Sequence, residues 1–278
     1  MIQDIVVNLT LGAGQDPAAD YAISVAKQFE AELSGIAFSY DPIVLAAATP
    51  MDAMPPDLIE AQRAESVKAA RQAVARFKQT AATAELEAEG RTVEASAGGA
   101  GSVFGRLART FDLTVVAQTG PDQPSSQDLI IEAALFESGR PIIVVPYIQK
   151  DAFKLDRVMV CWDGSRTAAR ALADAMPLLE YAKSIEVVTV SNGHDQNLNG
   201  HGAEAVAQHL TRHGLKAEIK PIVADTNVSG TLLSHAADTG ADIMVMGGYG
   251  HSRLRELVLG GATREILGSM TVPVLMSH

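Results

Sequence analysis

The sequence has little cysteine, few aromatic residues and no long apolar run. Cys161 is the only cysteine among 278 residues, which excludes an internal disulfide and a multi-cysteine metal site. Aromatic residues make up 5% of the chain. None of the apolar runs reaches the roughly 18 residues of a membrane-spanning helix. The opening MIQDIVVNLT lacks the basic segment and apolar core of a signal peptide. We therefore expect a soluble, cytoplasmic protein.

Positive charge is also scarce. Lys and Arg total 22 against 33 Asp and Glu, giving a formal net charge of −11 at pH 7. Nucleic acids and anionic membrane surfaces are bound through basic patches, so we expect neither as a partner. An apolar content of 47% is that of a folded globular protein and not of a disordered one.

Apolar runs of strand length alternate with helical patterns, which is typical of βαβ units around a parallel sheet. In the second part of the chain, strands are expected at 157–162, 185–190, 216–222, 242–246 and 272–276, with helices at 165–181, 202–213, 229–239 and 263–269. In the first part, strands are expected at 4–9, 34–38, 87–94, 113–117 and 141–145, with helices at 18–30, 58–79, 103–110 and 129–138.

Two pairs of segments repeat at an interval of about 130 residues. FDLTVVAQTG at 111–120 matches ADIMVMGGYG at 241–250, and GRPIIVVP at 139–146 matches MTVPVLM at 270–276. A tandem duplication accounts for both matches. The predicted fold class is therefore α/β, with two doubly wound parallel-sheet domains over residues 1–150 and 151–278.

The stretch MGGYGHSRLRELVLGGATREIL at 246–267 is the most informative one. Its glycines let the backbone approach a ligand, and the helix that follows offers free N–H groups and a positive dipole end to an anion. We interpret it as a phosphate-binding loop at the carboxyl ends of the strands. It is neither a Walker loop nor a dinucleotide fingerprint, because their motifs are missing. The plain alternative is that these glycines only form turns.

Gly247-x2-Gly250-x9-Gly260 resembles the nucleotide-binding motif of the universal stress protein family, G-x2-G-x9-G-(S/T). VMVCWDGSRTAARAL at 158–172 is similar to that family's first strand, turn and helix, with Asp163 at the acidic position of the first loop. The resemblance covers both parts of the chain. It implies a tandem member with a Rossmann-like, adenine nucleotide alpha hydrolase-like fold, similar to a family dimer fused into one chain and paired through its last strands.

The same resemblance implies ATP or a related adenine nucleotide, with or without Mg²⁺, as the ligand of the second part. Asp163 would bind the sugar or the base, and Gly250, Gly260, Gly261 and Ala262 the phosphates. The expected nucleotide-binding residues are Trp162, Asp163, Val190, Met246, Gly247, Gly250, His251, Gly260, Gly261, Ala262 and Thr263.

Two departures from the family motif limit this expectation. Gly261 stands where the family has Ser or Thr, so one hydroxyl contact to the phosphates is lost. In the first part, QTGPDQPSS at 118–126 lacks the glycine spacing, its prolines remove N–H donors, and Asp122 would repel phosphate. We expect one nucleotide site, in the second part.

The function implied is regulatory, in the stress response, with an unknown protein partner and a homodimer left open. No general base or metal-binding carboxylate pair is evident near the phosphates, so at most slow ATP hydrolysis is expected. One alternative is a stress scaffold or small-ligand carrier that binds no nucleotide, which the Gly261 departure favours. Another is a phosphotransferase that depends on Asp163.

Three other sets of residues are expected to be structural rather than catalytic or metal-binding. His209 and His213 are four residues apart on an expected helix, where exposed histidines are commoner than metal ligands. Cys161 is expected to be a buried small hydrophobe. Ser165 follows Asp-Gly and is expected to cap the next helix rather than to act as a nucleophile.

Overall fold

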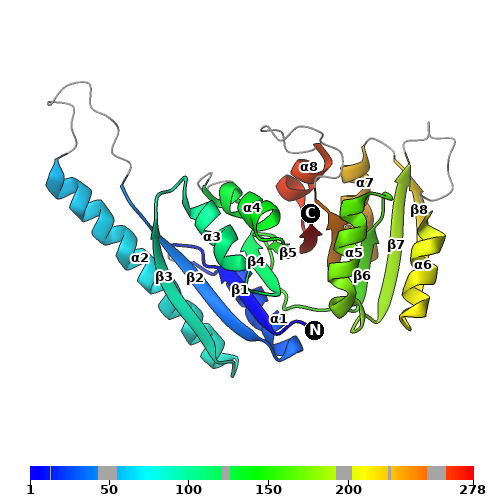
Figure 1. The fold of residues 1–278 in the computed structure, drawn as a ribbon, viewed down its shortest axis with the longest axis horizontal. Coiled ribbons are helices and arrows are strands. Elements are labelled where there is room, and N and C mark those ends of the chain that lie inside the picture. Colours follow the sequence, from blue (N-terminus) through cyan, green and yellow to red (C-terminus); the bar gives the residue numbers. More distant parts are fainter. Residues whose placement is uncertain (13, 43–54, 121–125, 192–201, 225–226, 249–260) are drawn as a thin grey trace.

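The computed structural model describes the whole chain except residues 13, 43–54, 121–125, 192–201, 225–226 and 249–260. The described residues form a ten-stranded sheet in the order β3-β2-β1-β4-β5-β10-β9-β6-β7-β8. Helices cover both faces of this sheet (Figure 1). The α/β class expected from the sequence is confirmed.

The expected elements are present, with ends that differ by a few residues. The strands are β1 (Asp4–Asn8), β2 (Glu32–Tyr40), β3 (Ala88–Ala95), β4 (Leu113–Ala117), β5 (Ile142–Val145), β6 (Arg157–Cys161), β7 (Ser184–Ser191), β8 (Ala217–Val223), β9 (Ile243–Gly247) and β10 (Val274–Ser277). The helices are α1 (Pro17–Phe29), α2 (Pro56–Thr83), α3 (Ala100–Ala108), α4 (Ser126–Glu137), α5 (Arg166–Leu179), α6 (Ala203–Arg212), α7 (Val228–Thr239) and α8 (Gly261–Ser269).

The first half, residues 1–150, and the second half, residues 151–278, show the same strand order. It is β3-β2-β1-β4-β5 in the first half and β8-β7-β6-β9-β10 in the second. Strands are parallel within each half, whereas β5 and β10 are antiparallel, with Val144 opposite Val274 and Ile142 opposite Met276. The expected pairing of the two last strands is confirmed. We call this pairing the β5–β10 joint.

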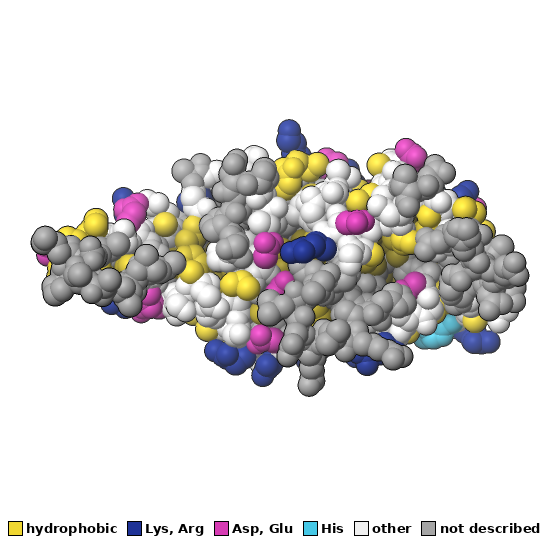
Figure 2. All heavy atoms as spheres, turned by 90° about the horizontal axis from the view of Figure 1, so that it is seen from above, with side chains coloured by type: hydrophobic (Ala, Val, Ile, Leu, Met, Phe, Trp, Pro, Cys, Tyr) yellow, Lys and Arg dark blue, Asp and Glu magenta, His cyan; other side chains and the backbone are white. Residues whose placement is uncertain are grey.

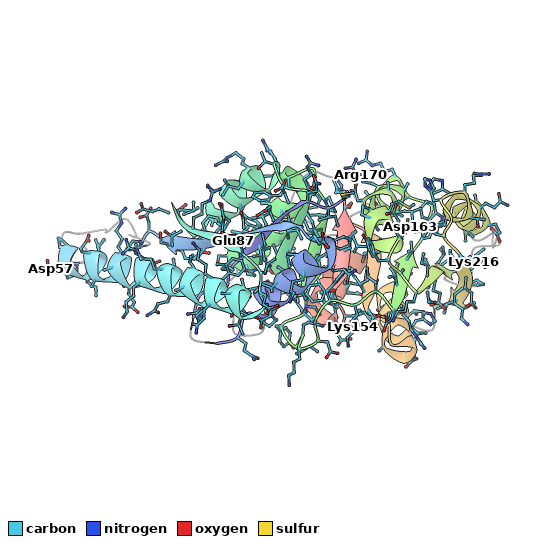
Figure 3. All side chains as sticks on the ribbon, turned by 90° about the horizontal axis from the view of Figure 1, so that it is seen from below. Asp57, Glu87, Lys154, Asp163, Arg170 and Lys216 are labelled. Atoms are coloured by element: carbon cyan, nitrogen blue, oxygen red, sulfur yellow. The ribbon has the colours of Figure 1, made fainter. Side chains whose placement is uncertain are left out.

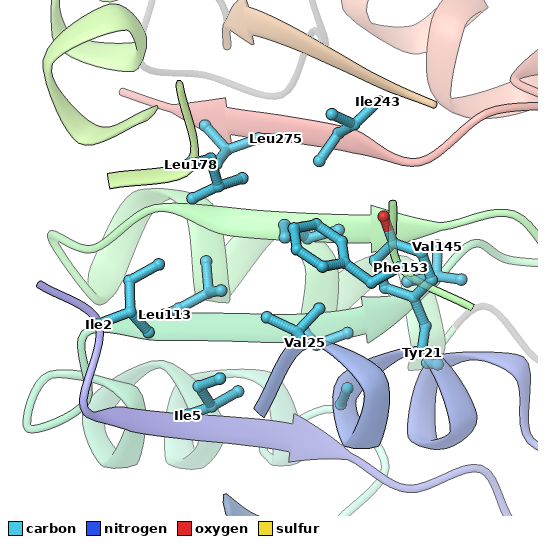
Figure 4. Close-up of a cluster of buried hydrophobic side chains, with 14 of the residues drawn as sticks. Ile2, Ile5, Tyr21, Val25, Leu113, Val145, Phe153, Leu178, Ile243 and Leu275 are labelled. Atoms are coloured by element: carbon cyan, nitrogen blue, oxygen red, sulfur yellow. The ribbon is translucent and has the colours of Figure 1, made fainter. Parts of the chain in front are cut away.

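Two apolar clusters hold the helices on the sheet. On one face, α1, α2, α5 and α6 share a cluster that runs across the joint, with Val145 of β5 and Leu275 of β10 both fully buried in it (Figure 4). The other face holds α3, α4, α7 and α8. Because each cluster contains residues of both halves, the halves share a core on both faces of the sheet.

Helix α3 packs directly on α4. A Cβ on Gly101 of α3 would lie 2.5 Å from the carbonyl oxygen of Leu129 of α4, which no real side chain tolerates. The glycine therefore lets the two helix backbones touch. This contact fixes α4, the helix that faces the second half.

Helix α2 is much longer than its neighbours. Its buried side chains are Ala70, Ala73, Phe77 and Ala81, and none is buried in its described residues 56–69. Asp57 lies at the end that extends beyond the sheet (Figure 3). The N-terminal part of α2 is thus held by polar contacts rather than by the apolar core: the hydroxyl oxygen of Ser66 accepts from the N–H of Tyr40 at 2.7 Å, and Arg63 donates to Glu94 of β3 at 3.0 Å.

The surface carries charges of both signs. Figure 2 shows one face from above, on which Lys and Arg side chains are spread out rather than gathered in one patch. Among the described residues, no helix combines the length and apolar composition that crossing a membrane requires.

Candidate functional site

The candidate site lies where the strand order of the second half reverses. The chain leaves β6 toward β7 on one side, and β9 pairs with β6 on the other side. In open α/β sheets, ligands bind outside the carboxyl ends of the strands at such a switch point. We therefore expect a ligand to bind at the carboxyl ends of β6 and β9.

A tight turn follows β6. The backbone N–H of Ser165 donates to Oδ1 of Asp163 at 2.9 Å, and Gly164 has a φ of +76°. The hydroxyl oxygen of Ser165 accepts from the N–H of Ala168 at 3.1 Å, so Ser165 caps α5 as predicted. The Asp163 carboxylate is exposed in the turn that leads into α5 (Figure 3).

Gly247, the last residue of β9, lies against the first turn of α5. A Cβ there would come within 2.5 Å of the backbone nitrogen of Ala168 and of the carbonyl carbon of Thr167. The preceding residue, Met246, is 7% exposed and belongs to the core cluster of the opposite sheet face. The end of β9 is thus joined closely to the helix that Ser165 caps.

Helix α8 begins at Gly261, and Gly261 and Ala262 are exposed while Thr263 is buried. A Cβ at Gly261 would have no heavy atom of the described residues within 4 Å, so nothing in that part of the chain crowds a side chain at this position. The hydroxyl of Ser229 in α7 donates to the carbonyl of Ala262 at 3.3 Å. The first N–H groups of a helix have no partner within it and attract anions.

Two further expected residues lie at neighbouring strand ends. Trp162 is half-buried, and its backbone N–H donates to the carbonyl of Val188 at 2.8 Å. Val190 is half-buried near the end of β7. The strand pairing brings the ends of β6, β7 and β9 to one edge. Gly250, His251 and Gly260 lie outside the described residues, as do Arg253 and Arg255.

Among the remaining groups, Cys161 is half-buried rather than fully buried as expected. Burial raises the pKa of the Cys161 thiol, and the negative charge of Asp163 raises it further, so the thiolate form is disfavoured. The ring of His209 in α6 meets that of His213, the residue directly after the helix, edge to face with centroids 4.7 Å apart. The described residues hold no group of three His, Cys, Asp or Glu side chains suited to a metal ion.

Sequence reasoning missed the contacts that this region makes with the first half. Gln118 contacts α8 and Leu135 contacts Gly248, although both belong to the first half. The only sequence signal for them was the expected pairing of the last strands, which brings α4 and α8 near each other.

The corresponding edge of the first half carries carboxylates. The hydroxyl of Thr119 donates to Oδ1 of Asp128 in the first turn of α4 at 2.5 Å. Asp16 caps α1 and accepts from the N–H groups of Thr10 at 2.6 Å and Ala19 at 3.2 Å. Burial raises the pKa of Asp16 despite these two hydrogen bonds, which lower it.

Replacing Asp16 with asparagine is expected to change how stability depends on pH. The folded pKa lies above the ordinary value of 3.8, so the folded state holds a proton that the unfolded state releases. The free energy of unfolding of the unchanged chain, relative to Asp16→Asn, should be highest below pH 3.8. It should fall as the pH rises through the folded pKa and then stay level. Urea unfolding of both proteins at a series of pH values measures this, and parallel profiles would contradict it.

Comparisons with known proteins bear on the second half. Residues 154–278 match the model of the Universal stress protein family. This part of the chain is a universal stress protein domain. Part of the chain is also similar to the universal stress protein Slr1230 of Synechocystis, with 27% identity over 172 residues. That match covers 59% of this chain and 57% of the relative, so the chain spans little more than half of its length.

Solved structures extend the likeness in fold to the first half. The crystal structure of a universal stress protein from Archaeoglobus fulgidus superposes with a TM-score of 0.69 at 15% identity, over 98% of this chain and 97% of that one. A structure from Pseudomonas aeruginosa gives 0.63 at 13% identity, over 99% and 93%. The universal stress protein domain and the half before it thus share their two-part architecture with known proteins.

Proposed function

We propose that this chain is a cytoplasmic tandem universal stress protein, divided near residue 150, that binds ATP or a related adenine nucleotide in its second half. The observation that supports the proposal is the position of three parts of the family's nucleotide-binding motif within residues 154–278. Asp163 follows β6, Gly247 ends β9, and α8 begins after the stretch that follows β9, so all three belong to the chain around the switch point. The family motif assigns the nucleotide to these parts.

The proposed roles follow from local chemistry. The N–H groups of Gly261 and Ala262 bind the phosphates, because they lie in the first turn of α8 and both residues are exposed. Asp163 accepts from ribose hydroxyls at the rim, and Trp162 and Val190 line the nucleoside side. Mg²⁺ would be held mainly by the phosphates, as is usual for this ion.

The proposed role is regulation rather than catalysis. A nucleotide between the β6 turn and α8 would connect the start of α5 with α8, and these two helices lie on opposite faces of the sheet. Its presence would alter the surface around the N-terminus of α8, which a protein partner can recognise. The first half is not assigned a nucleotide, since Asp128 places a carboxylate in the first turn of α4.

Opposite changes at Gly261 test the proposal. Gly261→Ser restores the hydroxyl of the family motif and is expected to tighten ATP binding by up to about tenfold. Gly261→Asp is expected to weaken it by a similar factor, because a carboxylate repels phosphate. Calorimetric titration of nucleotide-free protein gives the Kd. The emission of Trp162, the only tryptophan, gives a second readout at the site.

The stability of the Gly261→Asp variant distinguishes a loss of binding from a loss of folding. A carboxylate at a helix N-terminus stabilises the helix by about 0.3–1 kcal/mol, so Gly261→Asp should not lower the free energy of unfolding. A weaker Kd in this variant therefore reports on the ligand. Absence of heat and of any Trp162 response at millimolar ATP in the unchanged chain would overturn the proposal.

A further inference from the structure

The first half holds the C-terminal end of α8. Gln118, which follows β4, is 1% exposed. Its Nε2 donates to the carbonyl of Leu267 at 2.8 Å, and its Oε1 accepts from the N–H of Tyr147 at 3.2 Å. Leu267 lies in the last turn of α8, where carbonyls lack partners within the helix. One buried amide thus links α8 to the residues that follow β4 and β5.

The first half also contacts Gly248, which follows β9. A Cβ on Gly248 would come within 2.8 Å of Cδ2 of Leu135, so this side chain of α4 lies on the glycine. The carbonyl oxygen of Gly248 is 3.1 Å from Nδ1 of His278. The ring of His278 meets that of Phe136 edge to face, with centroids 4.9 Å apart. Gly248 is therefore placed by α4 through Leu135 and, via His278, through Phe136.

These two sets of contacts flank the glycine stretch in the sequence. Gly248 directly precedes residues 249–260, and α8 starts directly after them at Gly261. In the matching segments 111–120 and 241–250, Gln118 stands at the position of Gly248. Where the second half has a glycine, the first half thus has a long amide that reaches the other half.

We propose that the first half positions two parts of the phosphate site, with Gln118 holding α8 and Phe136 holding Gly248 after β9, so that both are positioning residues. This inference rests on the nucleotide site proposed above and concerns its dependence on the other half. The N–H groups of Gly261 and Ala262 bind an anion only when the helix axis points at it. Trp162 and Asp163 follow β6, so they keep their places when α8 shifts. Losing the contacts should therefore weaken phosphate binding and spare nucleoside binding.

Comparing ATP with adenosine separates this role from a purely structural one. Gln118→Met keeps the length of the side chain and removes its amide, and Phe136→Ala removes the ring next to His278. Leu129→Ala is the matched control, because Leu129 lies on the same helix and is 41% exposed against 43% for Phe136. Both test variants are expected to weaken ATP binding roughly five- to tenfold. Adenosine binding should stay unchanged, and the control should bind both ligands normally.

The other outcomes contradict either the positioning role or the proposed nucleotide site. Equal losses for ATP and adenosine, or no loss in either test variant, would overturn the positioning role while leaving the nucleotide site intact. If the unchanged chain binds no ATP, the proposed function fails. Hydrogen exchange of α8 then decides whether the anchoring exists. Faster exchange at residues 264–269 in Gln118→Met than in Leu129→Ala would support it, and equal exchange would overturn it.

Discussion

Replacing Phe104 with alanine is expected to lower the free energy of unfolding by about 3–5 kcal/mol. Phe104 belongs to α3, is fully buried, and meets Phe38 of β2 edge to face with centroids 6.3 Å apart. The cavity left behind cannot close easily, because Gly101 already brings the backbone of α3 into contact with α4. Denaturant unfolding followed by circular dichroism measures the loss.

Two further variants make this result specific to the cavity. Phe104→Leu keeps most of the volume and should cost less than about 1.5 kcal/mol. Leu129→Ala removes a side chain that is 41% exposed, and its cost should also be small. A loss for Phe104→Ala no larger than that for Leu129→Ala would contradict the described packing of α3.

Gly247→Ala is expected to destabilise the fold by about 3 kcal/mol, at the upper end of overpacking costs. The new Cβ would meet the backbone of Thr167 and Ala168 at 2.5 Å, and backbone atoms cannot move aside as a flexible side chain can. The first turn of α5 must therefore shift, and with it the cap that Ser165 forms. We also expect a changed Trp162 emission spectrum, since β6 pairs with β9.

A glycine of α8 provides the control for this variant. A Cβ at Gly268 would meet no heavy atom within 4 Å, so Gly268→Ala should stabilise the protein by about 0.5–1 kcal/mol through helix propensity. Denaturant unfolding of both variants shows the opposite signs. Wild-type stability and an unchanged Trp162 spectrum in Gly247→Ala would refute the close contact between β9 and α5.

Most of the fold was predictable because burial leaves a mark in the sequence. β4, β5 and β10 are buried on both faces and are therefore almost wholly apolar. The edge strand β3 carries charges, yet its β-branched residues still indicated a strand. The ends of α2 were less predictable. The helix was predicted to end at residue 79, whereas it ends at Thr83, and the hydroxyls of Thr80 and Thr83 donate to carbonyls one turn back.

The site was predictable only as far as its chemistry is local. The Asp163 turn and the Ser165 cap depend on residues within one turn of each other. The bond from Gln118 to Leu267 joins residues 149 positions apart, and no local pattern specifies such a pair. It follows from the antiparallel pairing of β5 with β10. The roles expected for Gly250, His251 and Gly260 stay predictions, since these residues are not described.

The β5–β10 joint has a consequence for how this protein can change over time. Two identical subunits joined through one strand carry every substitution on both sides at once. Here the two sides are separate stretches of one polypeptide, so each can mutate alone. Gln118 of the first half contacts Leu267, whereas Gly248, at the matching position of the second half, contacts Leu135. The two sides of the joint are therefore unequal. The joint also needs no second molecule, so its formation does not depend on protein concentration. A cell that makes few copies of this chain obtains the joined form as completely as one that makes many.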